Sequence, residues 1–194
     1  MASVHLNGLD EAIPADVVVL GIGVVPTCPD YLKDSSVIMD DLGHVLVNKF
    51  MESNLPNVWA GGDIAKFPLP LPTLSEPEMV AIGHWQIASK HGQVIGLNIA
   101  QEDLNLRQAI STVPFFWTVQ YGKSLRYAGY SPTFDDIIYD GDVSTGAFAA
   151  YFCQDNKVMG VATLGKDPVA ADFANILASG KVWNKSDIPS LSQL

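Results

Sequence analysis

Positive charge is scarce in this sequence, where 11 Lys and Arg residues stand against 21 Asp and Glu residues and give a formal net charge of −10. A protein that binds the phosphate backbone of a nucleic acid needs clustered Lys and Arg side chains. The composition therefore predicts that no nucleic acid is a partner of this chain.

Cysteine is also scarce, with only Cys28 and Cys153 along the chain. The two lie far apart and form neither a CxxC pair nor a zinc-ligand spacing, so we expect no metal site and no disulfide framework. A reducing compartment is the simplest interpretation. We expect both thiols to be buried as small apolar groups and not to serve as redox centres.

Long apolar runs are absent. None reaches the ~20 residues that a membrane-spanning helix needs, which predicts no membrane span. The opening stretch also lacks the basic region, apolar stretch and cleavage site of a secretion signal. An apolar run, DVVVLGIG, instead begins at Asp16. A core strand so near the first residue leads us to expect a fragment of a longer protein.

Hydrophobic residues are abundant, at 48% of the chain, which is enough for a substantial core. Asp16–Gly23 has the β-branched run of a strand covered on both faces by helices, and shorter strands are predicted at Val45–Val47 and Val58–Ala60. Residues 67–77 hold four prolines and predict a loop. From Glu78 to about Ala100 the spacing is helical, and the small residues there would allow close approach to a backbone or a flat ligand.

The last part of the chain predicts a separate α+β unit. Turn signals separate five β-like runs, at Phe115–Tyr121, Leu125–Tyr130, Asp136–Tyr139, Ala147–Phe152 and Lys157–Leu164. An amphipathic helix from about Asp167 to Ala178 follows, ended by Gly180. The predicted fold class is therefore α/β plus α+β, with part of a parallel-sheet domain followed by an antiparallel meander and one packed helix.

The stretch NVWAGGDIA, residues 57–65, brings a short apolar run to two glycines and one carboxylate, Asp63. Glycine lets a backbone come close to a ligand, and a carboxylate at such a place accepts hydrogen bonds from sugar-like hydroxyls. The alternative is that Asp63 caps the N-terminus of a helical turn. Taken alone, the stretch supports the two interpretations about equally.

The surrounding residues 41–69 resemble the second flavin-binding signature of FAD-dependent pyridine nucleotide-disulfide-type oxidoreductases. The matching residues are Gly43, Val45, Val47, Ser53, Val58, Trp59, Ala60, Gly62 and Asp63. The departures are mild, since Glu52 stands where threonine is usual and Trp59 replaces Tyr or Phe. The resemblance implies that Asp63 hydrogen-bonds the ribityl chain of FAD.

Three further segments resemble the same family in the same order. In VVVLGIGVVPTCPDYL, the residues Gly21, Gly23 and Pro26 match the segment that closes the NAD(H)-binding domain. In IGHWQIASKHG, the residues His84, Trp85, Ala88 and Gly92 match a helix start of ferredoxin-reductase-like members, with His91 in place of a glutamine. In VPFFWTVQYGKSLRYAGY, the matches are Pro114, Phe116, Trp117, Thr118, Gln120 and Tyr121.

Each of these matches also has a plain structural interpretation. The Gly21–Pro26 segment could be a strand end with a tight turn. His84 alone could be a packed or surface histidine, and Trp85 alone a core residue. The aromatic residues around Trp117 could fill the core of the predicted meander.

The resemblance is closest to the Rieske-containing, apoptosis-inducing-factor-like and ferredoxin-reductase-like branch of the family. It divides the chain into the end of an NAD(P)H-binding domain (residues 1–30), the C-terminal segment of an FAD-binding domain (31–110) and a C-terminal domain of the dimerisation or interface type (111–194). Both GxGxxG units of such an enzyme are missing here. We therefore expect the fragment alone to be inactive and to bind FAD weakly or not at all.

The function implied is electron transfer from NAD(P)H through FAD to an iron–sulfur or similar acceptor, with a 2Fe-2S centre in a domain outside this sequence. The implied flavin-side residues are Gly62, Asp63, His84, Trp85, Ala88 and Trp117, and the implied NAD side is Gly21, Gly23 and Pro26. The helix start would stabilise negative charge on the reduced ring, and Trp117 would approach the ring from the C-terminal domain. Hydride transfer needs no general acid or base, so no catalytic residue and no metal ligand is assigned.

The expected partners are a redox protein that accepts electrons and a second copy of the chain, because strands cut from a sheet leave unpaired edges. The alternative is a non-enzymatic interaction module without FAD binding, in which the acidic meander binds a protein partner or acts in cell-death signalling. The link to apoptosis is implied by the resemblance alone. The family suggests a mitochondrial or cytoplasmic location.

Overall fold

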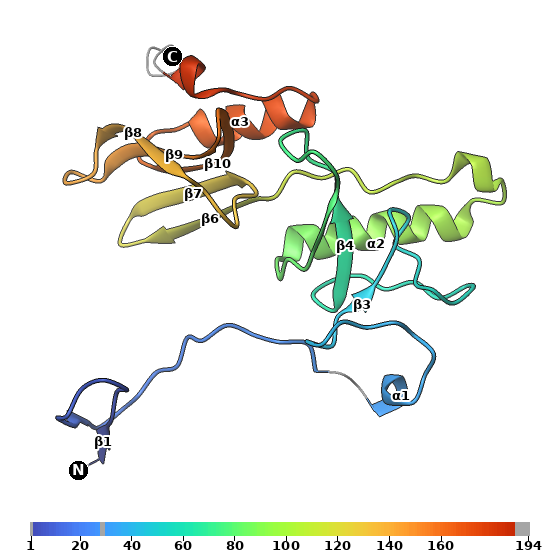
Figure 1. Cartoon of the computed structure of the whole chain (residues 1–194), viewed down its shortest axis with the longest axis horizontal. Helices are drawn as coiled ribbons and strands as arrows, with labels where there is room; N and C mark the ends of the chain where they lie inside the picture. The colour runs from blue at the N-terminus through green and yellow to red at the C-terminus, as the bar shows by residue number, and fades with distance from the viewer. Residues whose placement is uncertain (1, 28–29, 189–194) are drawn as a thin grey trace.

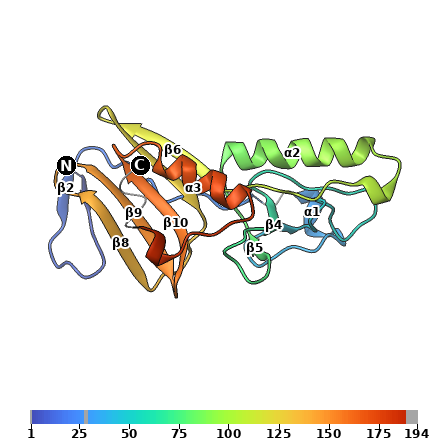
Figure 2. The same cartoon turned by 90° about the horizontal axis from the view of Figure 1, so that it is seen from above.

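The computed structural model describes residues 2–27 and 30–188. A hairpin of β1 (Ala2–Val4) and β2 (Ile13–Ala15) stands away from the rest of the chain, to which an extended segment joins it (Figure 1). The remainder holds a three-stranded sheet beside helix α2 and a five-stranded sheet beside helix α3 (Figure 1 and Figure 2). Among the described residues, no helix is both long and apolar enough to cross a bilayer.

The segment after β2 does not form the strand predicted at Asp16–Gly23. It runs extended and unpaired through residue 27, and Val17, Val19 and Ile22 are 81%, 90% and 85% exposed. The described chain resumes with the single turn of α1 (Asp30–Lys33). A strand of this composition needs paired neighbours in a covered sheet, and the described residues provide none. The predicted strand is therefore wrong for this chain, whereas the exposed apolar surface expected of an incomplete sheet is present.

The three-stranded sheet consists of β3 (Val45–Leu46), β4 (Ala65–Leu69) and β5 (Glu78–Val80). The central strand β4 is parallel to β3 and antiparallel to β5. The loop predicted for residues 67–77 is thus wrong at its start, where Pro68 lies inside β4. Proline is tolerated there because β3 pairs only with Ala65 and Lys66 and has ended before Pro68.

The strand predicted at Val58–Ala60 is reduced to one bridge between Trp59 and Glu52. Met51 and Asn57 have positive φ angles of 67° and 61°, so the chain turns too sharply for a longer ladder.

Helix α2 (Trp85–Ala100) begins seven residues later than predicted, because Glu78–Val80 form β5 instead. Its buried side consists of Ile87, His91, Val94 and Asn98. The Asn98 side chain is satisfied there, because it donates to Gln108 O at 2.9 Å and accepts from Gln108 N at 2.8 Å. Gly92 and Gly96 face open space and make no close approach.

All five strands predicted for the C-terminal unit are present, and all neighbours are antiparallel. They are β6 (Phe115–Gln120), β7 (Lys123–Gly129), β8 (Asp136–Asp142), β9 (Ala147–Gln154) and β10 (Lys157–Leu164). The order β6-β7-β10-β9-β8 departs from a plain meander, since β7 pairs with β10 and not with β8. The largely buried β10 takes the centre, while the acidic β8 takes an edge, where polar side chains protect against pairing with other chains.

Helix α3 (Val169–Ala178) packs on β7 and β10 and buries Phe173 and Leu177. It ends as predicted at Gly180, whose φ is +79°. The Lys181 N–H donates to Ile176 O at 3.1 Å and the Gly180 N–H donates to Leu177 O at 3.0 Å, the two bonds of a glycine-terminated helix. Two short 3-10 helices, η1 (Leu104–Leu106) and η2 (Lys185–Asp187), complete the described chain. Cys153 is buried as predicted, and Cys28 lies outside the described residues.

Candidate functional site

The two glycines of the GGD stretch let the turn before β4 press against α2. A Cβ on Gly61 would lie 2.9 Å from Ile95 Cδ1 and 3.0 Å from His91 Cβ. Gly62 has a φ of +81°, and a Cβ there would lie 3.8 Å from the Cβ of Ala88. The close approach predicted for a ligand is therefore, at Gly61, a close approach to the helix.

His91, on the buried face of α2, binds the same turn. Its Nδ1 accepts a hydrogen bond from the Gly62 N–H at 3.1 Å, and the side chain is fully buried. Burial lowers the pKa of His91 to about 4, and the ring meets Phe67 edge-on with 4.5 Å between centroids. The sequence showed this histidine only as a replacement for a glutamine. Its helical spacing from Ile87 and Val94 is the signal that could have placed it on the buried face.

Asp63 is exposed and points toward the chain that leads into α2. Its Cγ lies 3.7 Å from the place of a Cβ on Gly83. The alternative role as a helix cap is not observed, because β4 and not a helix follows the turn. Within the described residues the carboxylate makes no hydrogen bond or ion pair, so it is free to accept bonds from a ligand.

The start of α2 meets the first strand of the C-terminal unit. His84 is the N-cap and accepts from the Gln86 N–H through Nδ1 at 3.4 Å. Its ring lies 5.6 Å from that of Phe116, and Trp85 meets Trp117 edge-on at 6.4 Å between centroids. Trp85 is 66% exposed and Trp117 is 48% exposed, so neither is the core residue that its type alone predicts.

A cavity of about 400 Å³ adjoins Asp63. It is lined by Val24, Val25, Pro26, Thr27, His44, Asp63, Ile64, Ala81 and Gly83. Pro26, predicted on the NAD side, thus lines the same cavity as Asp63. Gly21 and Gly23 lie instead on the exposed segment, where a Cβ would meet nothing within 4 Å.

Asp40 pairs with the basic side chains His44 and Lys66 near this cavity. Burial alone would raise its pKa, but the His44 N–H, Lys66 and the His44 ring together hold the pKa of Asp40 well below its usual range. The Lys66 Nζ lies 3.0 Å from Asp40 Oδ2. Lys66 is thus paired with Asp40 and not with Asp63.

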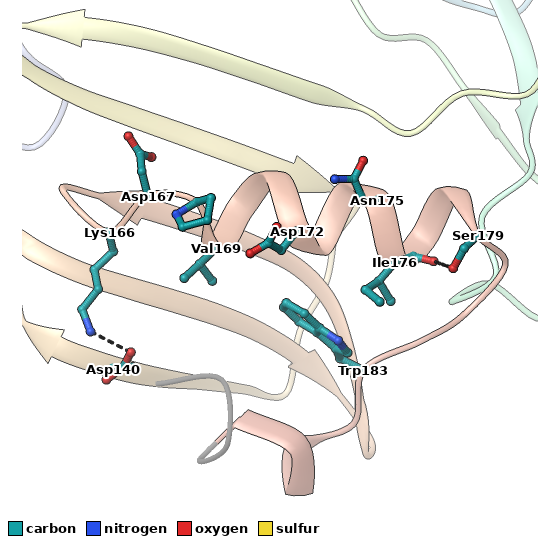
Figure 3. A pocket seen from close by; sticks show the side chains of 10 residues that line it. Asp140, Lys166, Asp167, Val169, Asp172, Asn175, Ile176, Ser179 and Trp183 are labelled. Carbon is teal, nitrogen blue, oxygen red and sulfur yellow. Dashed lines mark hydrogen bonds and ion pairs between the residues drawn. The ribbon is translucent and has the colours of Figure 1, made fainter. Parts of the chain in front are cut away.

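A larger cavity, of about 580 Å³, lies beside α3 in the C-terminal unit (Figure 3). Its walls include Val169, Ile176 and Trp183, and its charged side chains Lys166 and Asp140 pair with each other at 2.9 Å. Asp167 pairs with Arg126 at 2.7 Å. None of the predicted site residues lines it, and most of its charges are already paired. The candidate site is therefore the one around Asp63.

That site offers three features suited to a flavin: an unpaired carboxylate for polyol hydroxyls, a helix N-terminus for an electron-rich ring edge, and two exposed indole rings. The elements that provide them are the turn before β4, the start of α2 and β6. In the described part of the chain, no cluster of His, Cys, Asp and Glu could hold a metal ion. The donor set thus fits FAD.

Family models match most of the chain in two pieces. The model of pyridine nucleotide-disulphide oxidoreductases matches residues 2–92, and the model of the reductase C-terminal domain matches residues 115–188. The junction between the matched segments falls near the domain boundary predicted at residue 110, which stays a prediction.

Named relatives agree with these models. Apoptosis-inducing factor 3 of Mus musculus is 39% identical over 178 residues, which are 92% of this chain and 28% of the relative. Putidaredoxin reductase CamA of Pseudomonas putida is 26% identical over 162 residues, which are 79% of this chain and 34% of the relative. The chain thus spans about a third or less of the length of these two relatives.

Solved structures share the fold. A ferredoxin reductase of Rhodopseudomonas palustris matches with a TM-score of 0.78 at 20% identity, over 91% of this chain and 41% of that one. The covalent complex of putidaredoxin reductase with putidaredoxin matches with a TM-score of 0.77 at 23% identity, over 94% of this chain and 40% of that one.

Proposed function

Because the chain belongs to the pyridine nucleotide-disulphide oxidoreductases, we propose that it supplies the flavin-ring side of the FAD site in an NAD(P)H-dependent oxidoreductase. The observation that carries the proposal is the meeting of Asp63, the start of α2 and Trp117 at one place. These residues come from three separated stretches of sequence, and two of the elements, α2 and β6, belong to different units of the fold.

Bound FAD would supply the redox chemistry, taking up a hydride from NAD(P)H and passing electrons onward. The Asp63 carboxylate accepts hydrogen bonds from the ribityl hydroxyls. The N-terminal turn of α2, capped by His84, places partial positive charge beside the electron-rich edge of the ring. Trp85 and Trp117 bound the ring and exclude water from it. Gly62 lies beside Ala88 and is held to the helix by the hydrogen bond of its N–H to His91. No side chain of this chain is assigned a proton transfer.

The NAD(P)H side belongs to the same proposal. Pro26 borders the cavity at Asp63. This position supports the proposal that the segment around Pro26 leads from a nucleotide-binding domain toward the flavin. Gly21 and Gly23 precede Pro26 on the same extended and exposed segment.

The electron acceptor proposed is an iron–sulfur protein or domain. The solved complex of putidaredoxin reductase with putidaredoxin supports a redox protein in this role. A 2Fe-2S centre in a domain outside this sequence, a homo-oligomeric state and a mitochondrial or cytoplasmic location are further parts of the proposal that rest on the resemblance.

The test is a titration of the chain with FAD, followed by flavin absorbance and by quenching of tryptophan fluorescence. We expect saturable quenching that persists in Trp183→Phe, whose indole lines the separate cavity beside α3, and that is reduced in Trp117→Phe. Asp63→Ala should weaken binding about tenfold or more, as expected for hydrogen bonds to a charged acceptor.

A well-folded chain that binds no FAD at millimolar concentration would contradict the proposal for this chain. That result, combined with retention of a protein partner, would favour the non-enzymatic interaction module. The exposed apolar segment at residues 17–25 is the feature that such a module would use.

A further inference from the structure

His91 makes one hydrogen bond in a fully buried position, and its geometry fixes its protonation. Nδ1 faces the Gly62 N–H at 3.1 Å and must therefore be the unprotonated nitrogen. The proton of the neutral ring is then on Nε2, which is buried without a partner. The ring is thus assigned as the neutral Nε2–H tautomer.

A histidine at this place is a poor choice for stability alone. An unpaired buried donor at Nε2 carries a desolvation cost, and an apolar ring would fill the same space against Phe67 without it. What the histidine supplies, and an apolar ring does not, is an acceptor aimed at the Gly62 N–H.

That acceptor acts on the turn that carries Asp63. A Cβ on Gly61 would collide with Ile95 and His91, so the backbone of the turn lies directly against α2. Gly62 has a positive φ and directly precedes Asp63. The orientation of the peptide N–H at Gly62 therefore sets the direction in which the Asp63 side chain leaves the turn.

We infer that His91 is a positioning residue for the flavin, holding the Gly61–Gly62 peptide so that the Asp63 carboxylate faces the start of α2. The inference rests on the proposed function and deepens it. It assigns to a buried side chain, which does not touch the cofactor, control over the group that holds the ribityl chain.

Three variants of the 194-residue chain separate this role from simple packing. His91→Phe keeps a ring of similar size and removes the acceptor. His91→Asn places an amide oxygen near the position of Nδ1 and restores the acceptor. Tyr151→Phe is the matched control, because it removes another buried and unpartnered polar atom, in the C-terminal unit.

The measurement is the FAD dissociation constant, with thermal unfolding to show that each variant is folded. We expect His91→Phe to weaken FAD binding about tenfold, the scale of one hydrogen bond to a positioned group. His91→Asn should return to within about threefold of the wild type, and Tyr151→Phe should bind as the wild type does. In the Asp63→Ala background, His91→Phe should have no further effect, because the two residues act through one contact.

The outcomes distinguish the two claims. If Asp63→Ala weakens binding and His91→Phe does not, only the inference fails. If Asp63→Ala has no effect, or the wild type binds no FAD, the proposed function fails and the inference falls with it.

Nitrogen NMR of the wild-type His91 ring provides a readout that needs neither FAD nor a folded variant. The Nε2–H tautomer, together with slow exchange of the Gly62 amide proton, supports the inference. A proton on Nδ1 would overturn it.

Discussion

A single buried histidine makes the stability of this protein depend on pH. Burial lowers the pKa of His91 from its ordinary value of 6.5 to about 4. Between these values the unfolded chain binds a proton that the folded chain does not, so the free energy of unfolding falls as the pH drops from 6.5 to 4. The expected loss attributable to His91 is about 3 kcal/mol, and the contribution is constant above the upper value.

Urea unfolding at pH 7, 5.5 and 4 measures this dependence. Other groups titrate in the same range, so the quantity to compare is the difference between the wild type and His91→Asn, which cannot gain a proton. The free energy of unfolding of the wild type should fall relative to that of His91→Asn as the pH decreases from 7 to 4. Parallel pH profiles would show that His91 is not kept neutral by burial.

Some side chains around the site could be assigned from the sequence, and others could not. The resemblance brought Asp63, His84 and Trp117 together, and the structure joins the elements that carry them. Asp63 itself could not be assigned from its own neighbours, because a cap and a ligand contact look alike until β4 is seen to follow. The role of His91 was hidden because its partner, the Gly62 N–H, is 29 residues away.

At the level of the element, the glycines of α2 and of the turn beside it differ in the space around them. Gly61 is in tight contact with the helix, whereas Gly92 inside the helix faces open space. Gly61→Ala should destabilise the protein by about 1–3 kcal/mol, because Ile95 and His91 must shift. Gly92→Ala should stabilise it by about 0.5–1 kcal/mol, because alanine loses less backbone entropy in a helix.

Thermal or urea unfolding of both variants checks the pair, and FAD binding adds a second readout. Gly61→Ala displaces the turn and should weaken FAD binding, while Gly92→Ala should leave it unchanged. Equal effects of the two substitutions would contradict the packing described here.

Elements were predictable wherever local pattern and pairing agreed. The five C-terminal strands alternate or run apolar between clear turns, and α3 ends at a glycine that the bonds of Lys181 and Gly180 confirm. The strand β4 was missed because its proline marks a loop in a local pattern, and β5 was missed because its residues continue the helical spacing predicted from Glu78. Pro68 fits only because its neighbour β3 is short, and that is a property of the sheet.

The whole molecule exposes an apolar segment that its own described residues do not cover. Val17, Val19, Leu20 and Ile22 are all more than half exposed. We expect the chain to associate with itself, and light scattering should report a mass above the 20.9 kDa of one chain. Val19→Lys should shift the mass toward the monomer without lowering the unfolding temperature.

Gln93→Lys, on the exposed side of α2, adds the same charge elsewhere and is the control. A wild-type chain that is monomeric and binds no apolar dye would contradict this expectation.

The strand order of the C-terminal sheet also constrains how a nascent chain can build it. β7 pairs with β10, which is the last strand to be synthesised. The β7 edge of the β6–β7 hairpin therefore stays unpaired until β10 has left the ribosome. The strand made next, β8, is the nearest wrong partner. Its carboxylates Asp136, Asp140 and Asp142 make it a poor match for the apolar centre of the sheet. They therefore disfavour pairing of β8 with β7 before β10 has been synthesised.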